Sequence, residues 1–191
     1  MSSFSSFPSQ SGYLELVIGP MFSGKTTWLI EKYKSYKYIG KKITVINYSA
    51  DTRYSSTMLS SHDRNEIPCI FSNLIHDENV WKNIIDAEVI LINEGQFFAD
   101  LVISVREMVD VLKKQVFISG LDGDFRREKF GEILDLIPIC DKVEKLSAFC
   151  AICRDGTPAV FSKRLTEECS QVVIGSDNYV PLCRSCYLQK K

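Results

Sequence analysis

The chain has 191 residues, of which 45% are hydrophobic and 25% are charged, so it can bury a core and is not disordered overall. Its 23 basic and 24 acidic residues give a net charge of −1, which argues against a nucleic-acid or membrane partner. No apolar run could span a bilayer and no charged leader is present, so we expect a cytosolic or nuclear protein whose seven cysteines stay reduced.

The first third of the chain begins with a polar tail and then alternates between strand and helix patterns. Residues 1–12 are mostly Ser with Phe, Pro, Gln and Gly, and we expect them to form a disordered tail. The run YLELVIG at 13–19 predicts a buried strand, and the segment 24–40 predicts a helix. KKITVINYS at 41–49 predicts a second strand, and the polar segment 50–65 predicts a long loop of a kind that is often functional.

The same alternation continues through the middle of the chain. AEVILINEG at 87–95 predicts a third strand, apolar throughout as in a parallel sheet that is covered on both faces. Residues 100–114 predict a helix, and QVFISGLDG at 115–123 predicts a fourth strand. A short helix at 130–140 and a further strand at 142–149 complete a pattern typical of an α/β fold with right-handed crossovers. The chain then changes to short extended pieces, turns and paired cysteines.

The turn between the first strand and the first helix matches the phosphate-binding pattern G-x-x-x-x-G-K-[ST]. Its glycines let backbone N–H groups point at a β-phosphate, and the following helix adds its positive end. Lys25 can bridge the β- and γ-phosphates of ATP, and the Thr26 hydroxyl can ligate Mg²⁺. A chance match is the alternative, but a strand before and a helix after are the context that the motif requires. The loop comprises Gly19, Pro20, Met21, Phe22, Ser23, Gly24, Lys25 and Thr26.

A phosphate loop also needs a carboxylate at the end of a neighbouring strand, where it holds the water shell of the metal ion. In VILINEG the residue after Ile92 is Asn93, and the carboxylate is the next residue, Glu94. The alternative interpretation is that the strand simply ends on two polar residues. Four apolar residues followed by a carboxylate are nevertheless the pattern expected in the sheet of a phosphate-loop protein.

Two C-x-x-C pairs, Cys150 with Cys153 and Cys183 with Cys186, predict a zinc site with four thiolate ligands. Four thiolates leave no open coordination position for water, so the metal would be structural. A redox pair is the alternative, but such a pair usually begins a helix and occurs singly. The metal would close a small β-rich module at the C-terminal end of the chain.

A set of short motifs follows in one order from about residue 16 to residue 187: the phosphate loop, DTRYSS, HDRN, NEGQFF, LDGDF, KRL, VVIGSDNY and LCRSCY. Each motif alone has low specificity, but the ordered set closely resembles the type II (cytosolic and viral) thymidine kinase family. The resemblance implies a RecA-like P-loop α/β domain at 13–148 with a parallel sheet, and a small zinc-stapled lasso domain at 149–191. It also implies transfer of the ATP γ-phosphate to the 5′-hydroxyl of thymidine, or of deoxyuridine, and hence formation of thymidine monophosphate (dTMP) from thymidine.

The resemblance further implies a role for individual residues. Glu94 matches the catalytic base, which accepts the proton of the 5′-hydroxyl. Phe125 matches an aromatic residue that packs on thymine, with an ordinary core residue as the alternative, and Met21 and Ser162 match positions near the thymine methyl group. Contacts to ATP or Mg²⁺ are implied for Asp51, Thr52, Arg53, Asn93, Gly95 and Gln96. Contacts to thymidine are implied for Gln171, Val172, Val173, Ile174, Gly175 and Tyr179, and zinc binding for the four paired cysteines.

The chain departs from the family pattern at two positions near the expected site. Asn93 stands where the family usually has Asp, and Asp124 stands where Thr is common. An amide oxygen can still bind a water molecule of Mg²⁺, but more weakly than a carboxylate. By the same resemblance we expect a cytoplasmic homotetramer or homodimer that is inhibited by thymidine triphosphate.

Two other functions fit some of these residues. A phosphate-loop ATPase whose zinc module binds nucleic acid would use Glu94 to orient water. The near-zero net charge and the absence of a strongly basic zinc module argue against it. A relative that binds thymidine but no longer transfers phosphate, because of Asn93, is the third possibility.

Overall fold

The computed structural model of the protein describes residues 11–49, 58–60, 65–173 and 177–189. At its centre is a six-stranded sheet in the order β5-β2-β6-β7-β1-β8, in which every neighbouring pair of strands is parallel. The expected α/β fold with a parallel sheet is therefore confirmed. The strands are β1 (Tyr13–Ile18), β2 (Ile43–Tyr48), β5 (Ile70–Ser72), β6 (Val89–Ile92), β7 (Gln115–Gly120) and β8 (Lys142–Lys145).

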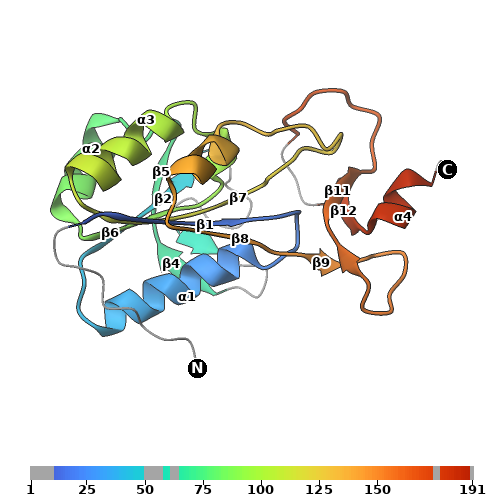
Figure 1. Cartoon of the computed structure of the whole chain (residues 1–191), viewed down its shortest axis with the longest axis horizontal. Helices are drawn as coiled ribbons and strands as arrows, with labels where there is room; N and C mark the ends of the chain where they lie inside the picture. The colour runs from blue at the N-terminus through green and yellow to red at the C-terminus, as the bar shows by residue number, and fades with distance from the viewer. Residues whose placement is uncertain (1–10, 50–57, 61–64, 174–176, 190–191) are drawn as a thin grey trace.

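Helices cover both faces of the sheet. Helix α1 (Lys25–Tyr38) lies on one face, and α2 (Glu78–Asp86) and α3 (Leu101–Arg106) lie on the other (Figure 1). Successive side chains of β6 point to opposite faces, so that Ile90 and Ile92 join the hydrophobic core under α2 and α3. Val89 and Leu91 join the second core, under α1. Because both faces are buried, this strand has no polar alternation in its sequence.

The segment between β2 and β6 contains more structure than its sequence indicated. Part of the predicted loop 50–65 forms β3 (Met58–Ser60), which pairs antiparallel with β4 (Glu66–Pro68). Leu59 and Ile67 of this hairpin are buried in the core under α1. Helix α2 also had no counterpart in the sequence-based assignment. It begins at Glu78 and is capped by Asp77, whose carboxylate accepts hydrogen bonds from the backbone N–H groups of Asn79 and Val80.

Three other predicted elements change in detail. The predicted helix 100–114 is α3 followed by a π-helical turn, η2 (Glu107–Val111), in which the N–H of Leu112 donates to the carbonyl of Glu107. The predicted short helix 130–140 is a 3₁₀ helix, η3 (Ile133–Ile139). The predicted single strand 142–149 is wrong, because β8 ends at Lys145 and β9 (Ala148–Phe149) pairs with a different strand.

After β8 the chain builds a second, smaller set of strands beside the sheet, at the right of Figure 1. Strand β9 pairs antiparallel with β10 (Pro158–Ala159), and β11 (Phe161–Arg164) pairs antiparallel with β12 (Tyr179–Leu182). Helix α4 (Arg184–Leu188) follows β12 directly. These elements share their own small hydrophobic cluster, in which three cysteines are buried.

In the described part of the chain, no helix combines the length and the apolar character needed to cross a bilayer.

A short 3₁₀ helix, η1 (Gly95–Phe97), follows β6 and begins the path to α3. Its position at the carboxyl end of a central strand matters for the site described below.

A buried carboxylate ties β1 to its neighbours on the α1 side of the sheet. The Glu15 carboxylate accepts a hydrogen bond from Lys32 of α1 at 2.9 Å and another from Lys142 of β8 at 2.7 Å. The Glu15 side chain is 3% exposed, whereas the two lysines reach solvent. Burial raises the pKa of Glu15, but the hydrogen bonds from Lys142 and Lys32 outweigh it and hold the pKa below its usual value.

We predict that Glu15→Gln lowers the free energy of unfolding at neutral pH by about 1–3 kcal/mol, because the two lysines lose their buried partner. The folded-state pKa of Glu15 is lowered, so its contribution is present above its unfolded pKa and is lost as the pH falls through the folded pKa. The difference from the parent protein should therefore shrink on acidification. Urea unfolding at a series of pH values measures it.

The matched control is Glu144→Gln, since Glu144 lies 3.9 Å from Lys142 with a side chain that is 46% exposed. We expect this control to change stability by less than about 0.5 kcal/mol. If Glu15→Gln were as stable as the parent at neutral pH, the buried carboxylate would not hold β1 in place.

Candidate functional site

The phosphate loop lies between β1 and α1, as its sequence predicts. Gly19 has φ 149°, and a Cβ atom there would lie 2.5 Å from the carbonyl oxygen of Leu146, so this position needs glycine. The Ser23 hydroxyl and the Lys25 ammonium both donate to the carbonyl oxygen of Pro20, at 2.8 and 2.6 Å. The loop is thus shaped by its own hydrogen bonds at the N-terminus of α1, where backbone N–H groups favour an anion.

The carboxyl ends of three strands are joined by buried polar side chains. Asn93, which follows β6, is 2% exposed. Its amide nitrogen donates to the side-chain oxygen of Asn47 of β2 at 2.9 Å, and its amide oxygen accepts from the Ser119 hydroxyl of β7 at 2.8 Å. Asn93 is therefore oriented on both sides, and its oxygen keeps a second lone pair.

Glu94 is held in an uncommon conformation beside Asn93. Its φ of 54° lies in the left-handed region, which is rare for residues other than glycine and often marks a functional site. The amide nitrogen of Gln96 donates to the Glu94 carboxylate at 2.6 Å, and the amide oxygen of Gln96 accepts from the backbone N–H of Leu121 at 2.9 Å. Gln96 is 3% exposed, so it fixes the carboxylate from a buried position.

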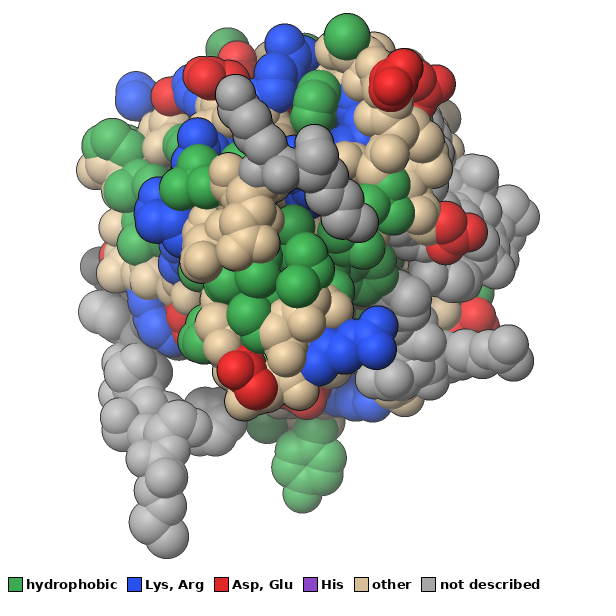
Figure 2. All heavy atoms as spheres, turned by 90° about the vertical axis from the view of Figure 1, so that its right-hand side faces the viewer, with side chains coloured by type: hydrophobic (Ala, Val, Ile, Leu, Met, Phe, Trp, Pro, Cys, Tyr) green, Lys and Arg blue, Asp and Glu red, His purple; other side chains and the backbone are tan. Residues whose placement is uncertain are grey.

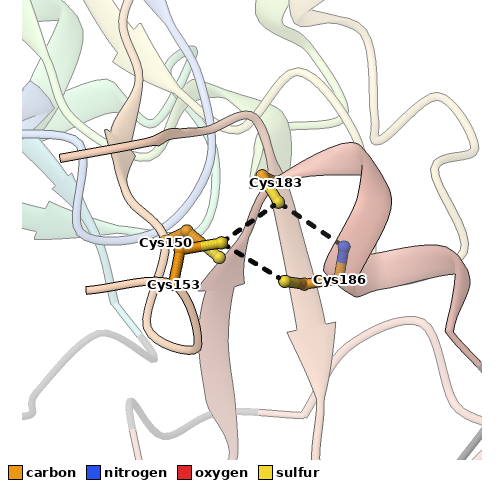
Figure 3. A group of neighbouring side chains, drawn as sticks. All are labelled: Cys150, Cys153, Cys183 and Cys186. Carbon is orange, nitrogen blue, oxygen red and sulfur yellow. Dashed lines mark hydrogen bonds between the residues drawn. The ribbon is translucent and has the colours of Figure 1, made fainter. Parts of the chain in front are cut away.

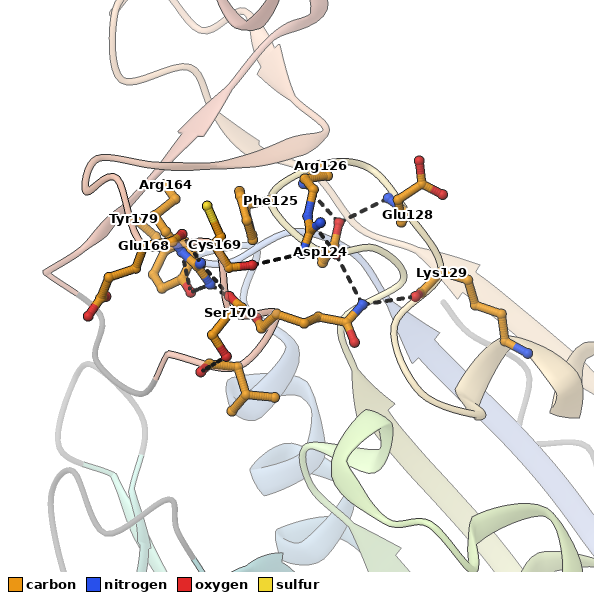
Figure 4. A network of polar contacts seen from close by, with 12 residues as sticks. Asp124, Phe125, Arg126, Glu128, Lys129, Arg164, Glu168, Cys169, Ser170 and Tyr179 are labelled. Carbon is orange, nitrogen blue, oxygen red and sulfur yellow. Dashed lines mark hydrogen bonds and ion pairs between the residues drawn. The ribbon is translucent and has the colours of Figure 1, made fainter.

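The loop after β7 is organised by Asp124, which is 5% exposed. One carboxylate oxygen accepts from the backbone N–H groups of Arg126 and Glu128, at 2.8 and 3.0 Å. The other accepts from the side-chain amide of Gln171 at 3.0 Å (Figure 4). Asp124, a departure from the family pattern, therefore both shapes the loop and contacts the segment before β12.

The structure brings Phe125 together with several of the residues expected to contact thymidine. Gln171 reaches Asp124, the neighbour of Phe125, and the Tyr179 hydroxyl donates to the carbonyl of Val173 at 3.2 Å. The carbonyl of Phe125 accepts from the Tyr187 hydroxyl of α4 at 2.6 Å. The carbonyl of Val172 accepts from the Ser170 hydroxyl at 3.2 Å. The expected thymidine contacts Ile174 and Gly175 and the expected ATP contacts Asp51, Thr52 and Arg53 lie outside the described residues.

A hydrogen bond connects the phosphate loop to the smaller set of strands. The backbone N–H of Met21 donates to the Ser162 hydroxyl of β11 at 2.9 Å. A hollow beside this bond is lined from the phosphate loop, the loop after β7, the end of β8 and β11, by Pro20, Asp122, Asp124, Lys145, Phe161 and Ser162. Met21 and Ser162, the two residues expected near the thymine methyl group, are therefore in direct contact.

The four paired cysteines converge on one point (Figure 3). Their sulfur atoms all lie within 4.8 Å of one another, and Cys153 Sγ is 3.8 Å from Cys183 Sγ and 3.5 Å from Cys186 Sγ. Four sulfurs placed about 2.3 Å from a tetrahedral zinc ion lie about 3.8 Å apart, so the cluster fits a metal of this type. Burial raises the pKa of Cys150, but backbone N–H groups of Cys153, Cys183 and Ile152 outweigh it and lower the pKa to about 6, which favours the thiolate.

Sequence reasoning gave no role to three residues that the structure connects to this region. Asp124 was noted only as a departure, and Arg164 and Tyr187 only as letters of the KRL and LCRSCY motifs. One signal was available for Arg164: it follows Ser162 by two residues in a strand, so both side chains point to the same, buried side. The hydroxyl of Tyr187 gives no comparable signal, because its partner is a backbone carbonyl far away in the sequence.

The surface of the smaller set of strands carries both signs of charge. Figure 2, which looks onto the side where β11, β12 and α4 lie, shows Lys and Arg side chains interspersed with Asp and Glu on the coloured part of this face. Hydrophobic side chains lie between them. A nucleic-acid-binding surface would instead show a continuous basic patch.

Comparisons with known proteins give a consistent result. The family model described as "Thymidine kinase" matches residues 12–187. The chain is 41% identical to "Thymidine kinase" of Sheeppox virus (strain KS-1) over 92% of this chain and 97% of that protein. It is 40% identical to "Thymidine kinase, cytosolic" of Cricetulus griseus over 96% of this chain and 76% of that protein. It is 42% identical to "Thymidine kinase" of Vaccinia virus (strain Western Reserve) over 93% of this chain and 97% of that protein.

Among solved structures, AMPPCP-bound DnaA from Aquifex aeolicus matches with a TM-score of 0.45 and 11% identity, over 73% of this chain and 41% of that chain. This likeness is too low to carry an argument about function.

We predict that Cys153→Ser lowers the metal content of the purified protein, because a tetrahedral thiolate site loses one of its four ligands. Elemental analysis of the dialysed protein measures the effect. Cys169→Ser is the matched control, since Cys169 is exposed and lies outside the cluster. Equal metal content in the parent and both variants, or no metal in any of them, would contradict the assignment.

Proposed function

The chain belongs to the thymidine kinase family, and from this premise we propose how its residues transfer the γ-phosphate of ATP to the 5′-hydroxyl of thymidine. The observation that carries the proposal is the hydrogen bond between Met21 and Ser162. It supports a single site in which the phosphate loop meets the strands expected to hold the nucleoside. Deoxyuridine differs from thymidine only by the methyl group, so we propose that it is a second substrate.

On the nucleotide side, we assign the phosphates to the Lys25 ammonium and to backbone N–H groups of the phosphate loop other than Pro20, which has none, and Met21, which donates to Ser162. Mg²⁺ bound with ATP would neutralise charge on the β- and γ-phosphates. The Thr26 hydroxyl and the amide oxygen of Asn93 are the groups that we assign to its coordination shell. Asp51, Thr52 and Arg53 remain proposed ATP contacts, in which Arg53 adds positive charge.

Glu94 is our proposed general base. Its carboxylate would accept the proton of the 5′-hydroxyl as the oxygen attacks the γ-phosphate. The hydrogen bond from Gln96 supports this role, because it orients the Glu94 carboxylate. We therefore assign Gln96 to the orientation of the base, alongside the proposed contact of Gly95 and Gln96 with ATP.

On the nucleoside side, we propose that Phe125 packs on the thymine ring and that the segment 171–175, with Tyr179, encloses the base. Backbone groups of an extended segment can pair with thymine, whose N3–H donates and whose O2 and O4 accept. Cytosine lacks the N3 proton and carries an amino group at C4. It would leave buried backbone groups unpaired, at a cost of about 1–3 kcal/mol each.

We propose that the metal held by the four cysteines is a structural zinc ion, since four thiolates leave no position for a reacting water. In this proposal residues 13–148 form the ATP-binding domain, and residues 149–191 form the lasso domain that the zinc ion closes. The family resemblance also supports a cytoplasmic homotetramer or homodimer that thymidine triphosphate inhibits.

We predict that Glu94→Gln lowers kcat for thymidine phosphorylation by roughly 10²–10⁴, because glutamine keeps the shape of the side chain but cannot accept the proton. Thymidine affinity should change much less. Steady-state phosphorylation of labelled thymidine, with binding measured by calorimetry, separates the two quantities. Glu78→Gln is the control, since the Glu78 side chain is 86% exposed on α2.

A Gln variant within a few-fold of the parent rate would give Glu94 another role. The same assay tests the function itself, since ATP turnover in the parent protein should require thymidine. Turnover that responds to added DNA and not to thymidine would indicate a nucleic-acid-dependent ATPase instead.

We predict that Asn93→Asp lowers the Mg²⁺ concentration needed for half-maximal rate by up to about ten-fold, because it adds a negative charge beside a partly solvated metal site. Ser119 can still donate to a carboxylate at this position. Mg²⁺ titrations at saturating ATP compare this variant with the parent. Asn83→Asp, which places the same charge on the exposed side of α2, is the control. Identical Mg²⁺ midpoints for all three proteins would show that Asn93 does not lie near the metal ion.

A further inference from the structure

Arg164, the last residue of β11, is 5% exposed and has a complete set of hydrogen-bond acceptors. Its Nη1 atom donates to the carbonyls of Glu168 and Ser170, and its Nη2 atom donates to the carbonyl of Gln171. Its Nε and Nη2 atoms both donate to the Tyr179 hydroxyl. The five N–H groups of a guanidinium are therefore all used (Figure 4).

The same guanidinium contacts the ring of Phe125. The central carbon of the Arg164 guanidinium lies 3.7 Å from the centre of this ring, and 5.2 Å from the centre of the Tyr179 ring. Among the described residues, no carboxylate forms an ion pair with Arg164. Its charge is balanced instead by carbonyl dipoles and aromatic faces, an arrangement suited to a buried guanidinium.

Arg164 thereby joins two parts of the chain that are distant in sequence. One is the segment 168–171, with Val173 added through the Tyr179 hydroxyl. The other is the loop that carries Phe125. The cysteine cluster does not anchor the segment 168–171 directly, because none of its four members lies between Cys153 and Cys183.

We propose that Arg164 is a positioning residue for the nucleoside. It sets the distance between the Phe125 ring and the carbonyl-bearing segment after β11, so that the base meets both surfaces at once. The inference rests on the proposed function, in which Phe125, the segment 171–175 and Tyr179 bind thymidine. Arg164 contacts Phe125, Gln171 and Tyr179 of this set directly. Arg164 acts through these groups and does not itself contact the phosphates.

The test is Arg164→Lys, which keeps the charge but loses the planar fork and two of the five N–H groups. The KM for thymidine should rise by about ten-fold or more, while the KM for ATP stays within about two-fold, because only the nucleoside surfaces lose their support. Metal content should equal that of the parent protein. Arg154→Lys, at an exposed arginine in the connection between β9 and β10, is the matched control and should leave both KM values unchanged.

Two outcomes would overturn the proposal. An unchanged thymidine KM in Arg164→Lys would show that the contacts do not position the base. A rise of both KM values together with a loss of thermal stability would show that Arg164 only supports the fold. If the lysine variant does not fold, Arg164→Gln keeps two N–H donors, and it must raise the thymidine KM selectively for the proposal to stand.

A double-mutant cycle separates this inference from the proposed function. If Arg164 acts through Phe125, then Phe125→Leu and Arg164→Lys should raise the thymidine KM by less in combination than the product of their separate effects. If the effects of the two substitutions on the thymidine KM multiply fully, Arg164 does not act through Phe125. If Phe125→Leu leaves the thymidine KM unchanged, the proposed base site is wrong. If Phe125→Leu raises the thymidine KM but Arg164→Lys does not, only the positioning role of Arg164 is contradicted.

Discussion

The parallel direction of all six strands is the constraint on which the rest of the molecule depends. Parallel strands place their carboxyl ends along one edge of a sheet, so the segments that follow them meet there. The phosphate loop follows β1, Glu94 follows β6, the loop of Phe125 follows β7, and the small cysteine-containing set of strands follows β8. Residues that are far apart in the sequence reach one edge because no strand in this sheet is reversed.

Elements with a strong local pattern were predictable from the sequence. The continuous apolar run of β6 and the glycines of the phosphate loop carry their conformation in a few consecutive residues. The missing elements depend on contacts at a distance: β3 and β4 are three residues each and are stabilised by Leu59 and Ile67 packing under α1. Helix α2 does have a local signal in the sequence, the capping carboxylate of Asp77 before an apolar pair.

The residues of the candidate site also fall into two groups, those that a local sequence pattern predicts and those that depend on distant contacts. The spacing of the cysteine pairs predicts their cluster, because Cys150 and Cys153 flank a turn, Cys183 and Cys186 lie at the start of α4, and only these two short segments must meet. The contact of Gln96 with Glu94 is local, but it depends on the left-handed φ of Glu94, which the sequence does not reveal. Asp124 is bonded to Gln171, which lies 47 residues away in the sequence. Arg164 is bonded to backbone carbonyls of the loop that follows β11, such as that of Gln171. Only the folded chain defines these pairs.

The hydrogen bond from the Met21 N–H to the Ser162 hydroxyl has a thermodynamic consequence. It joins the loop assigned to the nucleotide with the strand that leads into the segment assigned to the nucleoside, so the two proposed binding regions share one hydrogen bond. Coupling between two binding equilibria is reciprocal. Whatever factor the first ligand applies to the affinity of the second, the second applies to the first, and this short contact is a physical route for that exchange.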